Sequence, residues 1–151
     1  MVIYFGWDRL YPRPSGPRPM PVRTKCLFDT PEPEDGLRVL ITRWYPRGLR
    51  SSFYDEWSHA LAPDAALLRE YKHGGLPWDR FIARVRDRFE TDPLAGKALD
   101  KLARVSMHDT VTLLCYEKEG DDCHRHLVKE LIDRRIDGTI NKRVSAGAGA
   151  G

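Results

Sequence analysis

The stretch Val111-Thr-Leu-Leu-Cys-Tyr-Glu-Lys-Glu-Gly-Asp-Asp-Cys-His-Arg-His126 is the part of the sequence that decides the fold. Its apolar start predicts a buried strand over residues 111–114, because a short apolar run bounded by turn residues is typical of such strands. An acidic loop follows, and Asp121 or Asp122 is suited to cap a helix that ends at Gly138. A strand that leads through a loop into a helix indicates an α/β protein.

Residues 22–28 and the apolar run at residues 37–41 are predicted to form two more strands, and helices that begin at prolines are expected between residues 63 and 105. A further helix is expected to begin at Ser51 or Ser52, since apolar side chains recur there every four residues. The strands are continuous apolar runs, which favours parallel strands buried on both faces. We therefore predict an α/β fold with a small, mainly parallel sheet flanked by helices.

Three regions of the chain differ in composition. Residues 1–21 are a Pro-rich N-terminal arm, residues 22–140 a single α/β domain, and residues 141–151 a flexible Ala/Gly-rich tail. A length of 151 residues suits one domain with its own hydrophobic core. The arm is expected to pack on this domain, although its arginines and aromatic residues also suit a nucleic acid or a partner subunit.

The composition limits the classes of function. The formal net charge is only +3, which does not by itself indicate nucleic-acid binding. No apolar run approaches the roughly 20 residues of a membrane span. The N-terminus does not resemble a secretory signal, and an odd count of three cysteines favours free thiols in a reducing compartment. We therefore expect a cytoplasmic protein that does not enter a membrane.

Reactive side chains gather where the last strand ends and the last helix begins. Cys123, His124 and Arg125 are placed in the first helical turn, where free backbone N–H groups favour a thiolate. Cys123 is therefore a candidate nucleophile, with Glu117 or His124 to move a proton. Cys115, at the strand end, is a candidate ligand contact. The alternatives are that both cysteines are packing residues and that Glu117 pairs with an arginine.

A metal site is another interpretation of the same segment. The possible ligands are Cys115, Cys123, His124 and His126. Adjacent Cys123 and His124 on a helix would point about 100° apart, and the spacing matches no common zinc motif. We therefore expect neither a metal nor another cofactor. A disulfide between Cys115 and Cys123 is compatible with the geometry, but disulfides are rare in the cytosol.

A second loop, Arg43-Trp-Tyr-Pro-Arg-Gly48, supplies two arginines beside aromatic residues. Arg43 and Arg47 are suited to an anion and Trp44 to stacking, unless Trp44 anchors the loop in the core. Ligands of parallel sheets bind beyond the carboxyl ends of the strands. If the two strands are parallel neighbours, this loop and Arg125 form one crevice for a phosphate or carboxylate.

Six short motifs follow one another in this chain: Leu40-Ile-Thr-Arg-Trp-Tyr-Pro-Arg-Gly48, Asp55-Glu-Trp57, Leu61-Ala-Pro-Asp64, Trp78-Asp-Arg-Phe81, Cys115-Tyr-Glu117 and Cys123-His-Arg125. In order and spacing, residues 22–136 resemble the family known as domain of unknown function 488. Thr42 departs from one branch of that family, which carries Asp there. The resemblance implies a small α/β fold. It does not imply a particular reaction, because none is established for the family. It also implies a site at Arg43, Arg47, Cys115, Glu117, Cys123, His124 and Arg125.

Three functions are consistent with these observations. The first is an enzyme that acts on a phosphorylated or nucleotide-like ligand, in which Cys123 is the nucleophile or a supporting residue. The second is a non-catalytic nucleic-acid-binding module that uses the arginines with Trp44 and Tyr45. In the third, the Cys/His/Arg cluster is purely structural and ties two loops to the helix.

Overall fold

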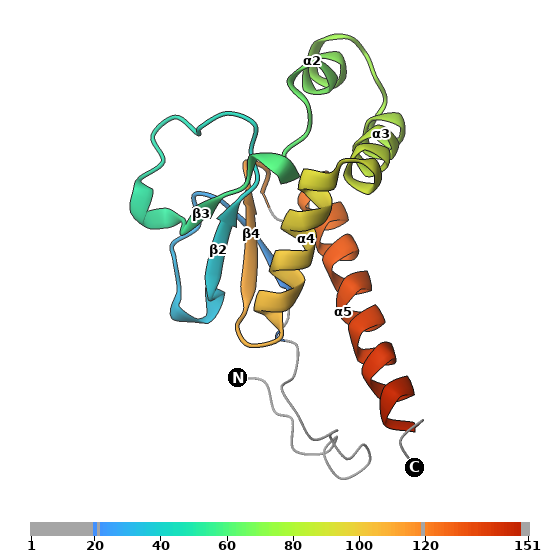
Figure 1. Ribbon diagram of the computed structural model, residues 1–151. Coiled ribbons are helices and arrows are strands. Elements are labelled where there is room, and N and C mark those ends of the chain that lie inside the picture. Colours follow the sequence, from blue (N-terminus) through green and yellow to red (C-terminus); the bar gives the residue numbers. More distant parts are fainter. Residues whose placement is uncertain (1–19, 21, 119, 149–151) are drawn as a thin grey trace.

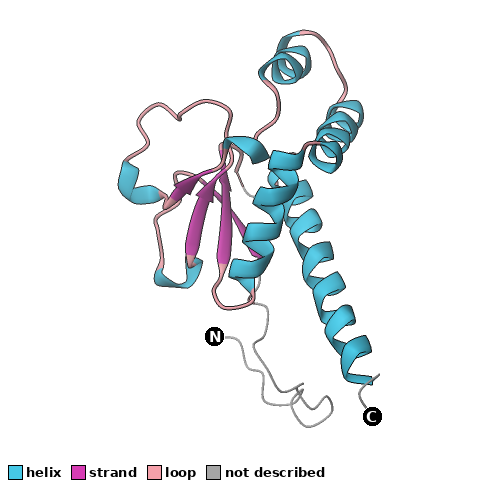
Figure 2. Cartoon of the chain, viewed as in Figure 1, coloured by secondary structure: helices cyan, strands magenta, loops and turns pink. Residues whose placement is uncertain are grey.

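A four-stranded sheet forms the centre of the protein (Figure 1, Figure 2). Its strands are β1 (Val22–Cys26), β2 (Leu37–Leu40), β3 (Glu56–Trp57) and β4 (Val111–Cys115), in the order β1-β4-β2-β3. Each neighbouring pair is parallel, and β4 lies between β1 and β2. The predicted α/β fold with a small parallel sheet is therefore confirmed.

The computed structural model describes residues 20, 22–118 and 120–148, so the predicted arm (residues 1–21) lies outside the described residues except for Met20. The α-helices are α2 (Ala65–His73), α3 (Trp78–Thr91), α4 (Pro93–Ser106) and α5 (Arg125–Ala148). At the start of α4, the Asp92 side chain accepts the backbone N–H of Leu94, and Pro93 occupies the first helical position. The helices predicted between residues 63 and 105 are confirmed.

Both faces of the sheet are buried. On one face, Val39 and Leu113 belong to the larger apolar cluster, which also contains side chains of α3, α4 and α5. Figure 1 shows α4 and α5 side by side next to the sheet. On the other face, Leu40 and Leu114 pack with Leu49 in a smaller cluster. Successive strand residues point to opposite faces, which explains why the central strand β4 is buried along its whole length.

The prediction of a helix that begins at Ser51 or Ser52 is wrong. The structure instead has the 3-10 helices η2 (Ser51–Phe53) and η3 (His59–Leu61) on either side of β3. The backbone N–H of Ser58 donates to the carbonyl of Leu40, so this segment is joined to the edge of β2. The apolar residues Phe53, Trp57 and Leu61 have the spacing of a helix face, but they do not share one face. Phe53 and Trp57 pack in the smaller cluster and Leu61 in the larger one, on opposite sides of the sheet.

Helix α5 continues through Gly138, where it was predicted to end, and reaches Ala148. A glycine inside a helix costs only about 1 kcal/mol relative to alanine, so it does not by itself terminate one. The part of the predicted tail from residue 141 to residue 148 is therefore helical in the structure.

A buried ion-pair cluster lies where the chain enters β2. Asp35, in η1 (Pro33–Asp35), is fully buried, and its carboxylate contacts Lys25 at 3.0 Å and the guanidinium of Arg38. Its backbone carbonyl accepts the hydroxyl of Thr112 in β4 at 2.7 Å. Burial alone would raise the pKa of Asp35, but hydrogen bonds from a backbone N–H, Lys25 and Arg38 outweigh it and lower the pKa. We call Asp35, Lys25 and Arg38 the Asp35 cluster.

Candidate functional site

Two loops meet at the carboxyl ends of β2 and β4. Because these strands are parallel neighbours, the residues that follow them emerge at the same edge of the sheet. Thr42 and Arg43 after β2, and Tyr116 and Glu117 after β4, line one cavity of about 50 Å³. The predicted convergence of the two loops is therefore confirmed.

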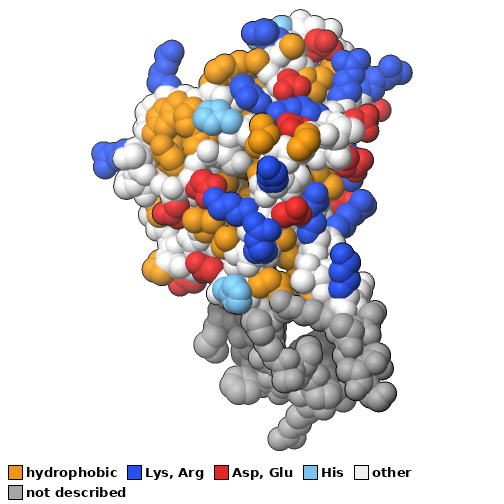
Figure 3. Space-filling model, in the orientation of Figure 1, with side chains coloured by type: hydrophobic (Ala, Val, Ile, Leu, Met, Phe, Trp, Pro, Cys, Tyr) orange, Lys and Arg blue, Asp and Glu red, His pale blue; other side chains and the backbone are white. Residues whose placement is uncertain are grey.

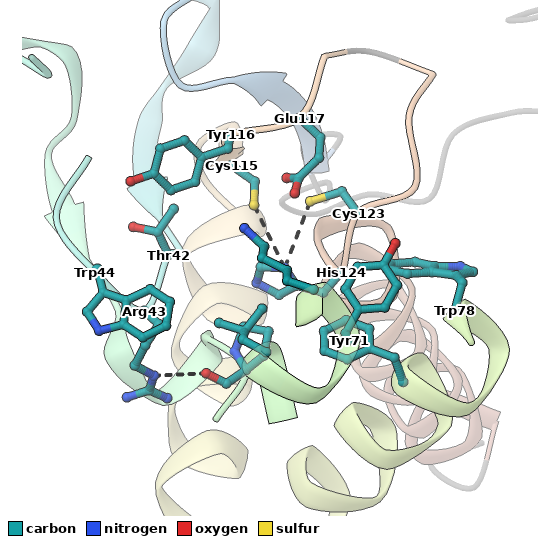
Figure 4. Close-up of a pocket in the computed structure, with 14 residues that line it drawn as sticks. Thr42, Arg43, Trp44, Tyr71, Trp78, Cys115, Tyr116, Glu117, Cys123 and His124 are labelled. Atoms are coloured by element: carbon teal, nitrogen blue, oxygen red, sulfur yellow. Dashed lines mark hydrogen bonds between the residues drawn. The ribbon is translucent and has the colours of Figure 1, made fainter. Parts of the chain in front are cut away.

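The cavity combines a reactive cluster with aromatic walls. Figure 4 shows Cys115, Glu117, Cys123 and His124 together, with Trp44 on one side and Tyr71 and Trp78 on the other. Tyr71 also stacks on Phe81 with a centroid distance of 4.6 Å, so α2 and α3 form a continuous wall. A single buried water needs about 10–15 Å³, so this cavity admits only a few waters or a small chemical group. The remaining lining residues are Thr42, Arg43, Pro63, Leu68, Lys72 and Tyr116.

His124 is held so that one ring nitrogen faces both thiols. Its Nε2 lies 2.9 Å from the backbone carbonyl oxygen of Ile41. A carbonyl oxygen only accepts hydrogen bonds, so Nε2 carries the hydrogen and Nδ1 of the neutral ring has a free lone pair. Nδ1 lies 3.8 Å from the sulfur of Cys115 and 3.8 Å from that of Cys123 (Figure 4). His124 can therefore accept a proton from either thiol.

Cys123 lies just before α5 and not in its first turn. Its sulfur, and not Asp121 or Asp122 as predicted, accepts the backbone N–H of Arg125 at 3.5 Å. A hydrogen bond from Cys115 is the main cause that lowers the pKa of Cys123 to about 6, and His124 and this N–H act in the same direction against burial. A thiol with this pKa is largely ionised at neutral pH.

Cys115 and Glu117 complete the cluster. The hydrogen bond to Cys123, together with burial, raises the pKa of Cys115, so this thiol keeps its proton. Burial alone would raise the pKa of Glu117, but hydrogen bonds from the two thiols and the charge of His124 outweigh it and lower the pKa. Within the described part of the chain, its Oε2 atom is buried without a hydrogen-bond partner. The cluster therefore contains one acidic thiol, one weakly acidic thiol and a carboxylate.

Arg125, predicted as a ligand contact, lies behind the cavity and does not line it. It is fully buried, and its guanidinium donates to the backbone carbonyls of Lys25 at 3.3 Å, Glu117 at 2.5 Å and Lys118 at 2.8 Å. These bonds connect the end of β1, the loop after β4 and the start of α5. Arg125 therefore positions the segment that carries the cysteines.

The three ligand-binding residues predicted on the loop after β2 do not all lie at the cavity. Arg43 lines the cavity, but its guanidinium also donates to the carbonyls of Pro63 at 2.8 Å and Ala62 at 3.0 Å. Trp44 lines the cavity and is 49% exposed, so it is not the core anchor considered as an alternative. Arg47 is exposed and is not among the lining residues.

Sequence reasoning missed several lining residues. Thr42 is buried, and its hydroxyl has no hydrogen-bond partner among the residues that the structure describes. Its position directly before Arg43 is a signal that could have found it. Tyr71 was not singled out in the sequence and Trp78 entered only as part of a motif, because only the packing of α2 against α3 brings them to the cavity. Lys72 gives no comparable signal in the sequence.

Three atoms of the cluster could hold a metal ion. The sulfurs of Cys115 and Cys123 and a ring nitrogen of His124 all lie within 4.8 Å of one another, and all three residues are buried. His126, the fourth ligand considered from the sequence, is exposed and does not belong to this group. The three described thiols are free in the structure.

The fold and the cluster together define a small parallel α/β protein with a Cys/His pocket at the carboxyl edge of its sheet. Residues 22–136 match the family model DUF488-N3a, described as "Active DUF488-N3 subclade". The chain therefore belongs to the DUF488 family, as the order of its motifs indicated.

Relatives of this chain are uncharacterised proteins. Rv3073c of Mycobacterium tuberculosis is 25% identical over 118 residues, which cover 76% of this chain and 95% of the relative. YeaO of Escherichia coli is 25% identical over 107 residues, which cover 70% of this chain and 90% of the relative. No solved structure matches the chain. Within the described residues, none of the helices has the length and apolar character needed to cross a membrane.

Proposed function

We propose that this protein is a thiol-dependent enzyme that acts on a small ligand with an anionic group, such as a phosphorylated or nucleotide-like compound. The observation that carries the proposal is the orientation of His124. Its Nε2 is held by the carbonyl of Ile41, so the lone pair of Nδ1 faces Cys123. A cysteine beside an oriented histidine is a typical activated nucleophile.

The proposed reaction transfers a group through Cys123. The reactive state is the Cys123 thiolate with the proton on Nδ1 of His124. The sulfur bonds to an electrophilic atom of the ligand while the leaving group departs with that proton. Water or a second substrate then takes the group from the sulfur, gives its proton to Nδ1 and restores the thiolate. The negative charge of Glu117 supports the positively charged ring, in keeping with the attraction between these two groups.

The dimensions and lining of the cavity support the ligand class. A volume of about 50 Å³ admits only the reacting group beside the thiols. The rest of the ligand would then lie against the exposed ring of Trp44. Arg43 and Lys72 line the same cavity, and Arg47 follows on the same loop, so basic side chains lie near the place proposed for an anion.

A ligand screen and a thiol assay together test this proposal. We expect one or more phosphorylated or nucleotide-like compounds to raise the melting temperature of the full chain. We also expect iodoacetamide to modify Cys123 at least roughly tenfold faster in the wild type than in His124→Gln, because His124 accepts the thiol proton. Cys26→Ser is the matched control, since the Cys26 thiol lies outside the cavity and contacts the carbonyl of Tyr116.

Two outcomes would overturn the proposal. If no compound stabilises the chain and His124→Gln leaves Cys123 alkylation unchanged, the cluster is structural. If instead nucleic acid binds with a steep salt dependence that Cys123→Ser does not alter, the protein is a binding module. On the face drawn in Figure 3, basic side chains lie among acidic ones, which gives this second outcome little support.

A cytoplasmic setting forms part of the same proposal. An ionised thiol close to a second thiol stays reduced only where the surroundings are reducing. The described cysteines are free thiols in the structure. Selective alkylation of intact cells, followed by mass spectrometry, should therefore find Cys123 reduced.

A further inference from the structure

We infer that Cys115, Cys123 and His124 form a three-ligand site for a thiophilic divalent cation such as Zn²⁺, which switches off the thiol while it is bound. The metal site itself does not depend on the proposed enzyme activity, whereas the switching of the thiol rests on that proposed function. The ligand atoms are the two sulfurs and Nδ1 of His124, which lie within 4.8 Å of one another (Figure 4).

The distances fit tetrahedral coordination. With Zn–S bonds of about 2.3 Å and Zn–N bonds of about 2.05 Å, ligand atoms at a tetrahedral angle are about 3.6 Å apart. The two sulfur–nitrogen distances are both 3.8 Å. Shifts of a few tenths of an ångström would therefore suffice for the sulfur–nitrogen pairs. The two sulfurs lie within 4.8 Å of each other, so they would approach by at most about 1 Å to reach the roughly 3.8 Å that two Zn–S bonds require.

The orientation of His124 is the one a metal ligand needs. Metal-binding histidines usually donate their other ring N–H to a carbonyl or carboxylate, which fixes the tautomer and the ring plane. The Nε2 of His124 has such a partner in the carbonyl of Ile41 at 2.9 Å. Because the carbonyl belongs to the backbone beside β2, the ring is fixed by the rigid sheet.

The objection from the sequence does not apply to this geometry. Adjacent Cys123 and His124 would point apart if both were inside a helix, but α5 begins at Arg125. Both residues belong to the non-helical approach to α5, where successive side chains can converge. Soft thiolate ligands with an imidazole favour Zn²⁺ over hard cations such as Mg²⁺.

The cluster also provides a position for a fourth ligand. The carboxyl group of Glu117 points toward the two sulfurs in Figure 4. Within the described residues, its Oε2 atom is buried and has no hydrogen-bond partner. A carboxylate oxygen or a water molecule in the cavity could therefore complete the tetrahedron, as at zinc sites with three protein ligands.

Metal binding and nucleophilic attack require the same sulfur lone pair. A cation bound to Cys123 and Cys115 would hold both thiolates and take the Nδ1 lone pair that otherwise accepts the proton. Bound Zn²⁺ should therefore protect Cys123 from alkylation, and a chelator should restore its reactivity.

Titration of the full chain with Co²⁺ and Zn²⁺ in reducing buffer tests the site. After treatment with a chelator, we expect Co²⁺ to give the intense visible bands of tetrahedral coordination and the near-ultraviolet band of a thiolate ligand, both lost on adding Zn²⁺. Cys115→Ser and His124→Asn should weaken Zn²⁺ binding by more than the roughly 10- to 100-fold that loss of an outer-shell partner costs. Cys26→Ser, the matched control, should bind as the wild type does.

The inference is overturned if Co²⁺ gives only the weak bands of octahedral coordination, or if Cys115→Ser binds as tightly as Cys26→Ser. Circular dichroism of each variant separates loss of the site from loss of the fold, and His124→Asn provides a second test if Cys115→Ser unfolds. Alkylation without metal reports on the proposed enzyme chemistry alone. A cysteine that is slow without metal, in a protein that still binds Zn²⁺, would remove the proposed function and the switching role and leave the metal site standing.

Discussion

The Asp35 cluster and the cavity bury polar groups at the same sheet in opposite ways. The Asp35 carboxylate meets Lys25, Arg38 and a backbone N–H. In the cavity, Thr42 Oγ1 and Glu117 Oε2 are buried without hydrogen-bond partners among the described residues. A buried unpaired polar atom costs about 1–3 kcal/mol, so it is expected where a ligand, ion or water supplies the missing bond. Complete pairing therefore marks a structural cluster, and incomplete pairing marks a binding site.

The largest expected effect is on the Asp35 cluster. Asp35→Asn should lower the free energy of unfolding by about 3–5 kcal/mol, because it removes one member of a buried ion-pair group. Urea denaturation of the full chain measures this. The control is Asp64→Asn, whose carboxylate pairs with Arg88 at 3.1 Å but is 54% exposed, and which should cost no more than about 1 kcal/mol. Equal losses in the two variants would contradict a structural role for the Asp35 cluster.

The same cluster should make the fold sensitive to acid. Asp35 has a lowered pKa in the folded state, so its contribution is fully present above the ordinary carboxyl pKa and is lost as the pH falls through the lowered value. Unfolding free energies measured from pH 7 down to pH 2 should therefore decline more steeply in the wild type than in Asp35→Asn. Parallel curves would show that other carboxylates cause the acid sensitivity.

A smaller effect is expected at Arg125, which connects the structural part of the protein to the cavity. Arg125→Lys keeps the charge but cannot reach three carbonyls, and hydrogen bonds from charged groups contribute roughly 1.5–3 kcal/mol each. We expect a loss of about 2–3 kcal/mol in unfolding free energy together with slower alkylation of Cys123. Arg84→Lys, at an exposed pair with Glu70, is the matched control. A variant that loses stability but keeps full Cys123 reactivity would show that the loop does not depend on Arg125.

Much of the fold could be predicted because it depends on local pattern. The sequence indicated β1, β2 and β4, the latter two as apolar runs, and prolines lie at or near the starts of α2, α3 and α4. The two-residue strand β3 could not be found in this way, since it exists only through its pairing with β2. The burial of Asp35 was also missed, because its partners Lys25 and Arg38 come from two different strands.

The candidate site was predictable in part for a related reason. Closeness in the sequence grouped Cys115, Glu117, Cys123 and His124, and the topological rule for parallel sheets placed the loop after β2 beside them. It could not show that Arg125 points toward backbone carbonyls, because orientation depends on where α5 begins. Because α5 begins at Arg125 and not before Cys123, the argument that adjacent Cys123 and His124 point apart on a helix no longer excludes a metal.

The smallest expected effect gives the sharpest comparison of the two regions. Thr42→Val removes a buried hydroxyl without a partner in the described part of the chain, so stability should change by less than about 1 kcal/mol, or rise. Thr112→Val removes the hydroxyl that donates to the Asp35 carbonyl at 2.7 Å, so it should cost about 1–2 kcal/mol. The two substitutions are chemically identical and both sites are buried, so urea denaturation compares pairing alone. If Thr42→Val costs as much as Thr112→Val, the hydroxyl of Thr42 is already bonded and is not available to a ligand.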